Sequence, residues 1–501
     1  MEFLTDPVLL ARVQFALTAM YHFIFVPLSI GLGLIVVVFE TKFYKSGKAE
    51  DAAASRFWIK VFTATFALGV ATGITMEFSF GTNWADYARF VGDIFGAPLA
   101  AEALLAFFLE SVFLGVLLFG RAKVSRLFYL VSAWLVWLGS CLSALWIIIA
   151  NSWMQTPAGA ELSADGTRAV LTDFMGAAFN ATTMPRYLHT VDALLIMGAF
   201  MALAIGAWYL KKSRHTEFAM RTVRVASAIG LITTCLMVVF AHQSAVVVAE
   251  EQPTKFAMME GAYETEAMPL YALGWVDEEN QKVITPFAIP GGTSFLASGT
   301  FDKEYAGLND LAKSGVYGDD FTEETVDQLP VNTVFQSYHI MIVMFGLIGL
   351  TTILAFIFSF RKGKIAKMRW LQNLAIVSPL FPFLAIQGGW VTAEIGRQPW
   401  VVYPAESSPD GISLLTGNAT SLAVSAPELA ITLILFTLIY LFLIIGWARI
   451  VINLIKKGPR ADEGDAILAL HGPSGKPVAQ DPAHAPAQGA SRTDNDGKDG
   501  E

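Results

Sequence analysis

Residues that could bind a metal or move a proton lie inside long apolar stretches of this sequence. Four of its seven histidines fall in or at the ends of such stretches: His22, His189, His242 and His339. An ionisable side chain at the centre of a membrane helix costs about 2.5–3.5 kcal/mol on translocon scales, so each one requires a physical reason. A histidine that only hydrogen bonds to a neighbouring helix would be one such reason. Several at one depth, together with carboxylates, favour a functional role.

Histidine and methionine are both ligands of heme iron, and a His/Met pair raises the potential of a low-spin heme. His189 opens one apolar stretch, and Met341 lies one or two turns into another that begins on the same side. The two side chains can therefore face each other at one depth. Zinc or copper would need more closely clustered His and Cys residues. The sequence also contains no Walker A, CxxCH or HExxH motif.

Two carboxylates lie in the segment PLAAEALLAFFLESVFLGVLLFG. Glu102 and Glu110 are eight residues apart, which in an α-helix separates them by about 12 Å along the axis and about 80° around it. They share one side of the helix and descend toward the middle of the membrane. Chains of membrane carboxylates are typical of proton relays. The structural alternative is a pair of acids that hydrogen bond to neighbouring helices.

The segment WVTAEIGRQPW ends another apolar stretch. Polar and aromatic residues recur there on one helical face: Gln387, Trp390, Glu394 and Arg397. Pro399 disfavours a helical conformation of the residue before it, so the helix ends here. An arginine at this end could bind an acidic group such as a propionate, and the glutamate could ligate a metal or carry a proton. A capping ion pair of Glu394 with Arg397 is the structural alternative.

The composition predicts the elements that position these residues. The chain has 501 residues, of which 54% are hydrophobic and 15% charged, whereas soluble domains are about 25% charged. The apolar residues form long blocks, and a span takes roughly 20 of them. We therefore expect an all-α, polytopic membrane protein with about nine transmembrane helices, over residues 13–40, 58–82, 98–120, 127–150, 188–210, 222–248, 333–360, 371–395 and 427–455.

Basic residues gather in every second short loop, after the first, third, fifth, seventh and ninth stretches. Loops rich in Lys and Arg stay in the cytoplasm. The N-terminus is therefore expected outside and the C-terminus in the cytoplasm, which agrees with an odd number of helices. The N-terminal sequence MEFLTDP has no basic region, so we expect no cleavable signal peptide.

Two polar segments interrupt this pattern. We divide the chain into helices 1–6 (residues 1–248), an external loop (249–331), helices 7–9 (332–457) and a cytoplasmic tail (458–501). The loop is long enough to be functional or disordered. The tail is dominated by Pro, Ala, Gly and charged residues, so disorder is expected there.

Several other classes are disfavoured. Cys141 and Cys235 fall inside expected helices, so we interpret them as small core residues and not as a disulfide framework. The net charge of −9 gives no indication of a nucleic-acid partner. No internal repeat is visible, which weakens the case for an inverted-repeat transporter. A proton-coupled transporter nevertheless stays open, and it would carry no visible chromophore.

Five separate motifs resemble the large subunit of cytochrome bd-type quinol oxidases: RVQFALTAMYHF, FALGVATGITMEFSFGTNW, VGDIFGAPLAAEALLAFFLES, NSWMQTP and GRQPW. The resemblance extends from about residue 10 to 455, with the motifs in the family's order. The short external loop resembles the short-loop branch, which includes cyanide-insensitive oxidases. The resemblance implies nine helices in a bacterial cytoplasmic membrane and an enzyme that oxidises quinol and reduces dioxygen to water.

The resemblance also implies three hemes. His189 and Met341 would hold a low-spin heme b. His22 and Glu394 would be ligands in a two-heme oxygen-reducing site that contains a high-spin heme b and a heme d, or a third heme b. The resemblance leaves open which of the two hemes each residue ligates. Three further residues would surround heme: Arg12, Trp390 and Arg397.

Protons and quinol have implied sites too. Glu102 and Glu110 would lie on a proton path, with Ser143 beside it. Lys255 and Glu260, in TKFAMMEGAYET, would be associated with ubiquinol or menaquinol. Quinol would be oxidised at the outer face, and protons for water would come from the cytoplasm. The partners implied are a second large subunit and, in many relatives, a small single-helix peptide.

Two histidines depart from the family's pattern. In long-loop relatives an arginine tends to occupy the place of His339 and an aspartate that of His242, so we interpret His339 as structural or electrostatic. Heme–copper oxidases need an adjacent histidine pair. Quinol–cytochrome c reductases need histidine pairs 13 or 14 residues apart on two helices. The sequence has neither pattern.

Overall fold

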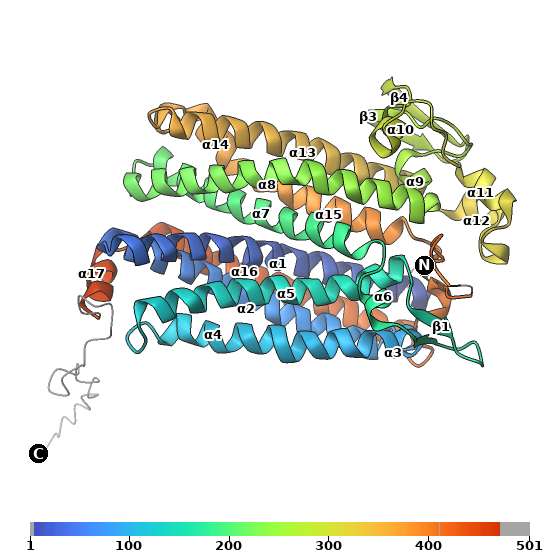
Figure 1. Cartoon of the computed structure of the whole chain (residues 1–501), viewed down its shortest axis with the longest axis horizontal. Helices are drawn as coiled ribbons and strands as arrows, with labels where there is room; N and C mark the ends of the chain where they lie inside the picture. Colours follow the sequence, from blue (N-terminus) through green and yellow to red (C-terminus); the bar gives the residue numbers. More distant parts are fainter. Residues whose placement is uncertain (1–4, 410, 471–501) are drawn as a thin grey trace, which may run out of the picture.

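The computed structural model describes residues 5–409 and 411–470. Within these residues, nine helices or helix pairs are long and apolar enough to cross a membrane, which confirms the all-α polytopic class. They run side by side in one bundle (Figure 1). Six of the spans are uninterrupted helices: α1 (Pro7–Ser46), α2 (Ala49–Gly81), α5 (Arg126–Gln155), α8 (Thr216–Glu251), α13 (Val331–Phe360) and α16 (Ala426–Lys457).

The third span contains a π-helical segment. It consists of α3 (Ala85–Ala101), the π segment η2 (Glu102–Phe107) and α4 (Phe108–Phe119). A π segment accommodates about one extra residue per turn. The eight steps from Glu102 to Glu110 therefore turn the chain about as far as seven steps of an α-helix. The angle between the two residues around the helix axis is then about 20°, whereas an unbroken α-helix would give about 80°. The two carboxylates are thus more nearly aligned than the sequence predicted.

The fifth and eighth spans are each built from two helices. In the fifth, α6 (Phe174–Ala178) precedes α7 (Thr183–Lys211), and in the eighth, α14 (Arg369–Val377) precedes α15 (Leu380–Ile395). The helix α15 ends four residues before Pro399, as the sequence predicted. After it, β5 (Trp400–Val402) pairs with β6 (Leu414–Leu415), and the 3₁₀ turn η5 (Thr416–Asn418) follows.

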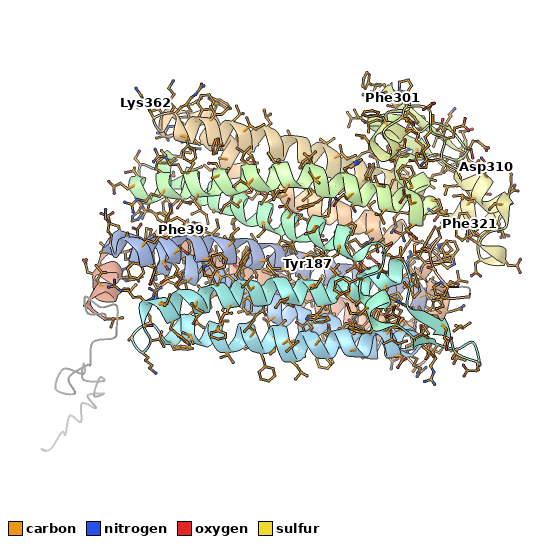
Figure 2. All side chains as sticks on the ribbon, in the orientation of Figure 1. Phe39, Tyr187, Phe301, Asp310, Phe321 and Lys362 are labelled. Atoms are coloured by element: carbon orange, nitrogen blue, oxygen red, sulfur yellow. The ribbon has the colours of Figure 1, made fainter. Side chains whose placement is uncertain are left out.

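Residues 249–331 fold at one end of the bundle, which we call the loop end. Figure 2 places Phe301, Asp310 and Phe321 there and Lys362 at the opposite end. The segment has its own core, which includes Phe256 and Tyr271 and packs on Phe335 of α13. Its elements are α9 (Pro253–Glu260), β3 (Leu270–Asp277), β4 (Lys282–Ile289), α10 (Gly292–Ser298), α11 (Leu308–Ser314), η3 (Gly318–Asp320) and α12 (Glu323–Gln328). A hairpin of β1 (Ala160–Leu162) and β2 (Ala169–Leu171) lies at the same end (Figure 1).

The first part of the polar tail is helical. Helix α17 (Ala461–Ala469) packs against α2 at the end opposite the loop end. The Nζ of Lys60 lies 2.6 Å from a carboxylate oxygen of Glu463, and Ile467 is buried against Phe43. The prediction of disorder is therefore wrong for α17. Residues 471–501 lie outside the described residues.

The helices that carry His22 and His189 meet at a pair of glycines. A Cβ on Gly31 of α1 would lie 2.6 Å from the Cα of Gly198 on α7, and a Cβ on Gly198 would overlap the backbone of Gly31. Small residues at such crossings let two membrane helices approach closely. This contact fixes α7 against α1.

Replacing Gly198 with alanine is expected to destabilise the protein by about 1–3 kcal/mol, because the added methyl group forces α1 and α7 apart. Thermal unfolding in detergent would measure the change. Gly346→Ala is the matched control, since a Cβ there would have nothing within 4 Å among the described residues. An unchanged unfolding temperature for Gly198→Ala would show that the crossing is not tight.

Candidate active site

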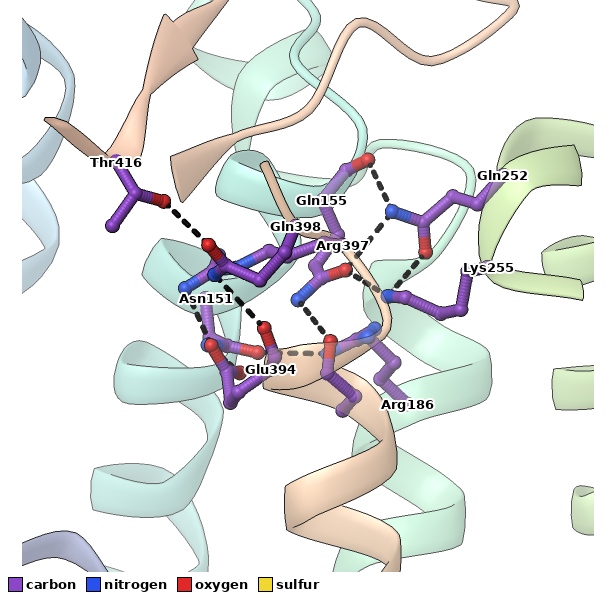
Figure 3. Close-up of polar contacts among 10 residues, drawn as sticks. Asn151, Gln155, Arg186, Gln252, Lys255, Glu394, Arg397, Gln398 and Thr416 are labelled. Carbon is purple, nitrogen blue, oxygen red and sulfur yellow. Dashed lines mark hydrogen bonds and ion pairs between the residues drawn. The ribbon is translucent and has the colours of Figure 1, made fainter. Parts of the chain in front are cut away.

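A cluster of polar side chains surrounds the end of α15 (Figure 3). Arg397 forms an ion pair with Glu394, the contact that the sequence analysis gave as the structural alternative. Asn151 Nδ2 of α5 donates a hydrogen bond of 3.1 Å to Glu394 Oε1. Arg186 of α7 donates a bond of 2.7 Å to Asn151 Oδ1. Three spans therefore hold the carboxylate of Glu394 in place.

Lys255 of the external segment belongs to the same cluster. Its Nζ donates to the Oε1 atoms of Gln155 and Gln252, and Gln155 Nε2 donates to the backbone of α15 at 3.3 Å. A Cβ on Gly396 would lie 2.9 Å from Lys255 Cγ, so the lysine stem covers the turn between Glu394 and Arg397. Lys255 is 1% exposed. Burial lowers the pKa of Lys255 well below its usual value.

The cluster contains more basic groups than acidic ones. Arg186, Lys255 and Arg397 face a single carboxylate, that of Glu394. Within residues 5–409 and 411–470, the Nε and Nη1 atoms of buried Arg397 have no hydrogen-bond partner. A buried donor without a partner costs about 1–3 kcal/mol, and more when it is charged. The cluster is therefore suited to an anionic group that accepts hydrogen bonds.

A cavity of about 330 Å³ opens beside this cluster. It brings together four of the residues that the resemblance assigned to heme: Arg12, Trp390, Glu394 and Arg397. Aromatic residues of α1 to α3 complete much of its wall. Such a cavity, largely apolar with a few convergent polar groups, is typical of cofactor sites.

His22 lies against α2. Its Nδ1 is 2.8 Å from Thr72 Oγ1, and a Cβ on Gly73 would lie 3.3 Å from the ring. The lining residues of the cavity do not include His22. The structure therefore places His22 and Glu394 in different surroundings. Ligands of two separate groups would be arranged in this way.

His189 and Met341 lie on two helices, α7 and α13, that share their neighbours. Helices α7 and α13 both pack against α8 and against α15. His189 shares a face of α7 with Ile196, and Met341 shares a face of α13 with Ile348. Ile196 and Ile348 meet in one buried cluster. Among the described residues, Nδ1 of His189 has no hydrogen-bond partner.

Both carboxylates of the third span face α5. Ser143 Oγ donates a hydrogen bond of 2.8 Å to Glu102 Oε1. A Cβ on Gly139, one turn along α5, would lie 2.8 Å from Glu110 Cγ. The π segment explains why both reach the same helix. The structure thus places Glu102 and Glu110 against α5, with Ser143 bonded to Glu102.

Glu260 faces a different neighbourhood from Lys255. The two residues are five positions apart on α9, about 140° around the helix. Glu260 is buried near the hydroxyls of Thr293 and Tyr338, yet neither carboxylate oxygen makes a hydrogen bond of normal geometry with the described residues. Burial raises the pKa of Glu260 to about 8. The two residues that the resemblance associated with quinol therefore lie in two different surroundings.

Sequence reasoning did not single out Asn151, Gln155, Arg186 or Gln252 as site residues. Asn151 and Gln155 are four residues apart in the motif NSWMQTP, which places them on one face of α5. Arg186 lies three residues before His189. Both observations were available in the sequence, but only the folded chain shows that these residues meet at Glu394.

Comparison with known proteins gives a consistent result over most of the chain. The family described as cytochrome bd terminal oxidase subunit I matches residues 10–459. Subunit 1 of the cytochrome bd-II ubiquinol oxidase of Escherichia coli (strain K12) is 35% identical over 515 residues, which are 92% of this chain and 98% of that protein.

Two further proteins extend the comparison. Subunit 1 of the cytochrome bd ubiquinol oxidase of Bacillus subtilis (strain 168) is 35% identical over 458 residues, 90% of this chain and 94% of that protein. The bd oxidase structure from Geobacillus thermodenitrificans superposes with a TM-score of 0.80 at 26% identity, over 91% of this chain and 99% of that one.

Proposed function

We infer the function of this chain from one premise: it belongs to the cytochrome bd terminal oxidase subunit I family. It is therefore a subunit of a terminal quinol oxidase in a bacterial cytoplasmic membrane. We propose that it carries the hemes of that oxidase, oxidises ubiquinol or menaquinol at the outer face and reduces dioxygen to water. The observation that carries this proposal is the buried cluster around Glu394, with its excess of basic groups beside a cavity.

The residues present fit heme. Glu394 and His22 would hold the two hemes of the oxygen site, a high-spin heme b and a heme d or third heme b. His189 and Met341 would hold the low-spin heme b. The unpaired donors of Arg397 suit the carboxylates that every heme carries. Bound heme would supply the electron transfer and the reduction of dioxygen.

Quinol oxidation releases protons, and Glu260 would accept one. Its carboxylate is fully buried where α9 meets α13, and its raised pKa of about 8 makes it a stronger base than an ordinary glutamate. Lys255 would act at the other site, where it lies against Gly396 and contributes positive charge beside Glu394.

Quinol-driven reduction of the low-spin heme is expected to become faster as the pH rises from about 6 to about 8. Only ionised Glu260 can accept a proton, and with a pKa of about 8 about a tenth of it is ionised at pH 7. Anaerobic stopped-flow absorbance would measure the rate. Glu260→Gln should be slow and independent of pH in this range. Asp302→Asn, at an exposed carboxylate of the same segment, should keep the normal profile.

Protons for water would come from the cytoplasm, and Glu110 followed by Glu102 would form the last part of their path. We expect Glu110→Gln to lower oxidase turnover at least about tenfold, because a proton relay with one member missing is interrupted. Charge separation in vesicles should fall with it, while heme content stays normal. Normal turnover and normal charge separation in the variant would remove Glu110 from the path.

The long apolar surface of the bundle faces lipid and partner subunits. Many large apolar side chains of α4 and α16 are exposed, among them Phe108, Phe119, Ile431 and Phe442. Part of this surface would contact the second large subunit, and a small single-helix peptide would occupy another part.

Oxygen uptake by the purified native complex tests the proposed function. Addition of a short-chain ubiquinol or menaquinol should start oxygen consumption without any added cytochrome c. A pure, intact complex that contains heme and consumes no oxygen with either quinol would contradict the proposal.

A further inference from the structure

Buried polar groups converge where α9, α10, β3 and α13 meet. Glu260 comes from α9 and Tyr271 from β3, while Thr293 lies in α10. Tyr338 and His339 come from the third turn of α13. Glu260 and His339 are 1% and 4% exposed. We call this group of five residues the α9–α13 cluster.

His339 presents an unused hydrogen-bond acceptor to this cluster. Its Nδ1 lies 2.8 Å from the carbonyl oxygen of Phe335. A carbonyl oxygen only accepts, so Nδ1 carries the proton and Nε2 of the neutral imidazole is an acceptor. In the part of the chain that the structure describes, Nε2 is buried and has no partner.

Glu260 also has buried hydrogen-bond acceptor atoms that are not used. Both of its carboxylate oxygens are buried without a hydrogen bond of normal geometry from any described residue. Buried polar atoms in native proteins are nearly always paired, so unpaired ones require an explanation. Two buried acceptors from two elements, both without a hydrogen bond of normal geometry from the described residues, indicate a ligand that brings two donors.

Aromatic rings pack around His339 in this cluster. The rings of Phe335 and His339 are stacked, with their centroids 3.9 Å apart. The ring of Tyr271 lies 5.8 Å from Phe335 and 6.4 Å from His339. Tyr271 and Tyr338 also interact electrostatically with Glu260. A flat ring with a polar group on each side matches walls of this kind.

We propose that His339 binds the quinol headgroup and makes the site selective for the reduced form. A quinol carries two hydroxyl donors, one for Glu260 and one for Nε2 of His339. The oxidised quinone carries two carbonyl oxygens, which only accept, so it cannot satisfy His339. This inference rests on the proposed quinol oxidase function and adds a specificity-determining residue to it.

Anaerobic stopped-flow reduction of the low-spin heme by a short-chain ubiquinol tests the proposal in the purified complex. His339→Leu should raise the half-saturating quinol concentration about tenfold, since one hydrogen bond is lost. The limiting rate and the dithionite-reduced spectrum should stay unchanged. The concentration of ubiquinone that gives half-maximal inhibition should also stay unchanged, because quinone makes no bond to Nε2.

Two further variants complete the experiment. His339→Gln retains an acceptor oxygen and should recover part of the affinity for quinol. His242→Leu is the matched control, because His242 is an exposed histidine of α8, and it should behave as wild type.

Unchanged quinol affinity in His339→Leu would overturn the proposal, and so would an equal loss of affinity for quinol and quinone. Loss of the low-spin band would overturn it too and assign His339 to the heme pocket. Failure of quinol to reduce the heme of the wild-type complex would refute the proposed function itself.

Discussion

Replacing Glu394 with alanine is expected to abolish oxygen reduction, with turnover falling at least about a hundredfold. Glu394 is the single carboxylate among Arg186, Lys255 and Arg397, and it lines the cavity of about 330 Å³. Its removal takes away a proposed iron ligand and leaves buried basic groups without a counter-charge. Breaking a buried pair by removing one partner typically costs about 3–5 kcal/mol.

Oxygen uptake and heme content per chain would measure this loss. The heme of the oxygen site should disappear from the spectrum while the low-spin heme remains. Glu250→Ala is the matched control, because Glu250 is an exposed carboxylate on the last turn of α8, and it should retain full activity. A Glu394→Ala protein with full heme content and normal turnover would show that Glu394 is only a capping residue.

Replacing Met341 with leucine is expected to remove the low-spin spectrum and to slow quinol-driven reduction at least about a hundredfold. Leucine and methionine have similar volumes, so the fold should lose less than about 1.5 kcal/mol. The proposed thioether ligand is lost, however, and leucine offers no lone pair to iron. The change therefore separates ligation from packing at the contact between Met341 and Gly389.

Reduced-minus-oxidised absorbance spectra would test this expectation. The low-spin α-band should weaken or shift in Met341→Leu, with the other heme bands retained. Val343→Leu provides the control on the same helix, since residue 343 is turned about 200° from residue 341, is exposed and has no assigned role. Unaltered low-spin bands in Met341→Leu would exclude Met341 as a ligand.

The fold was largely predictable because a helix that crosses a bilayer needs a long run of apolar residues. Apolar stretches long enough to span a membrane identified all nine spans in the described residues, and Pro399 gave the end of α15. The π segment at Glu102 was not predictable, since one extra residue in a turn leaves no mark on hydropathy. Helix α17 was missed because its charged surface resembles a disordered tail, and only its contacts with Lys60 and Phe43 order it.

The sequence identified several residues of the cluster around Glu394, but not the contacts between them. Sequence spacing placed Glu394 beside Arg397, because the two residues are only three positions apart at the end of α15. The sequence analysis grouped Lys255 with Glu260. The two residues are about 140° apart around a helix, however, so their side chains were expected to point in different directions. The partners of Glu394 on α5 and α7 come from distant parts of the chain, and local patterns contain no information on such contacts.

One measurement tests the central claim most directly. The native complex, purified in detergent, should be recorded as a dithionite-reduced minus air-oxidised spectrum, with pyridine hemochrome analysis per mole of this chain. We expect three hemes per chain, with b-type bands and, if heme d is present, a red-shifted chlorin band. Intact protein without any heme would contradict the account and would return a proton-coupled transporter to consideration.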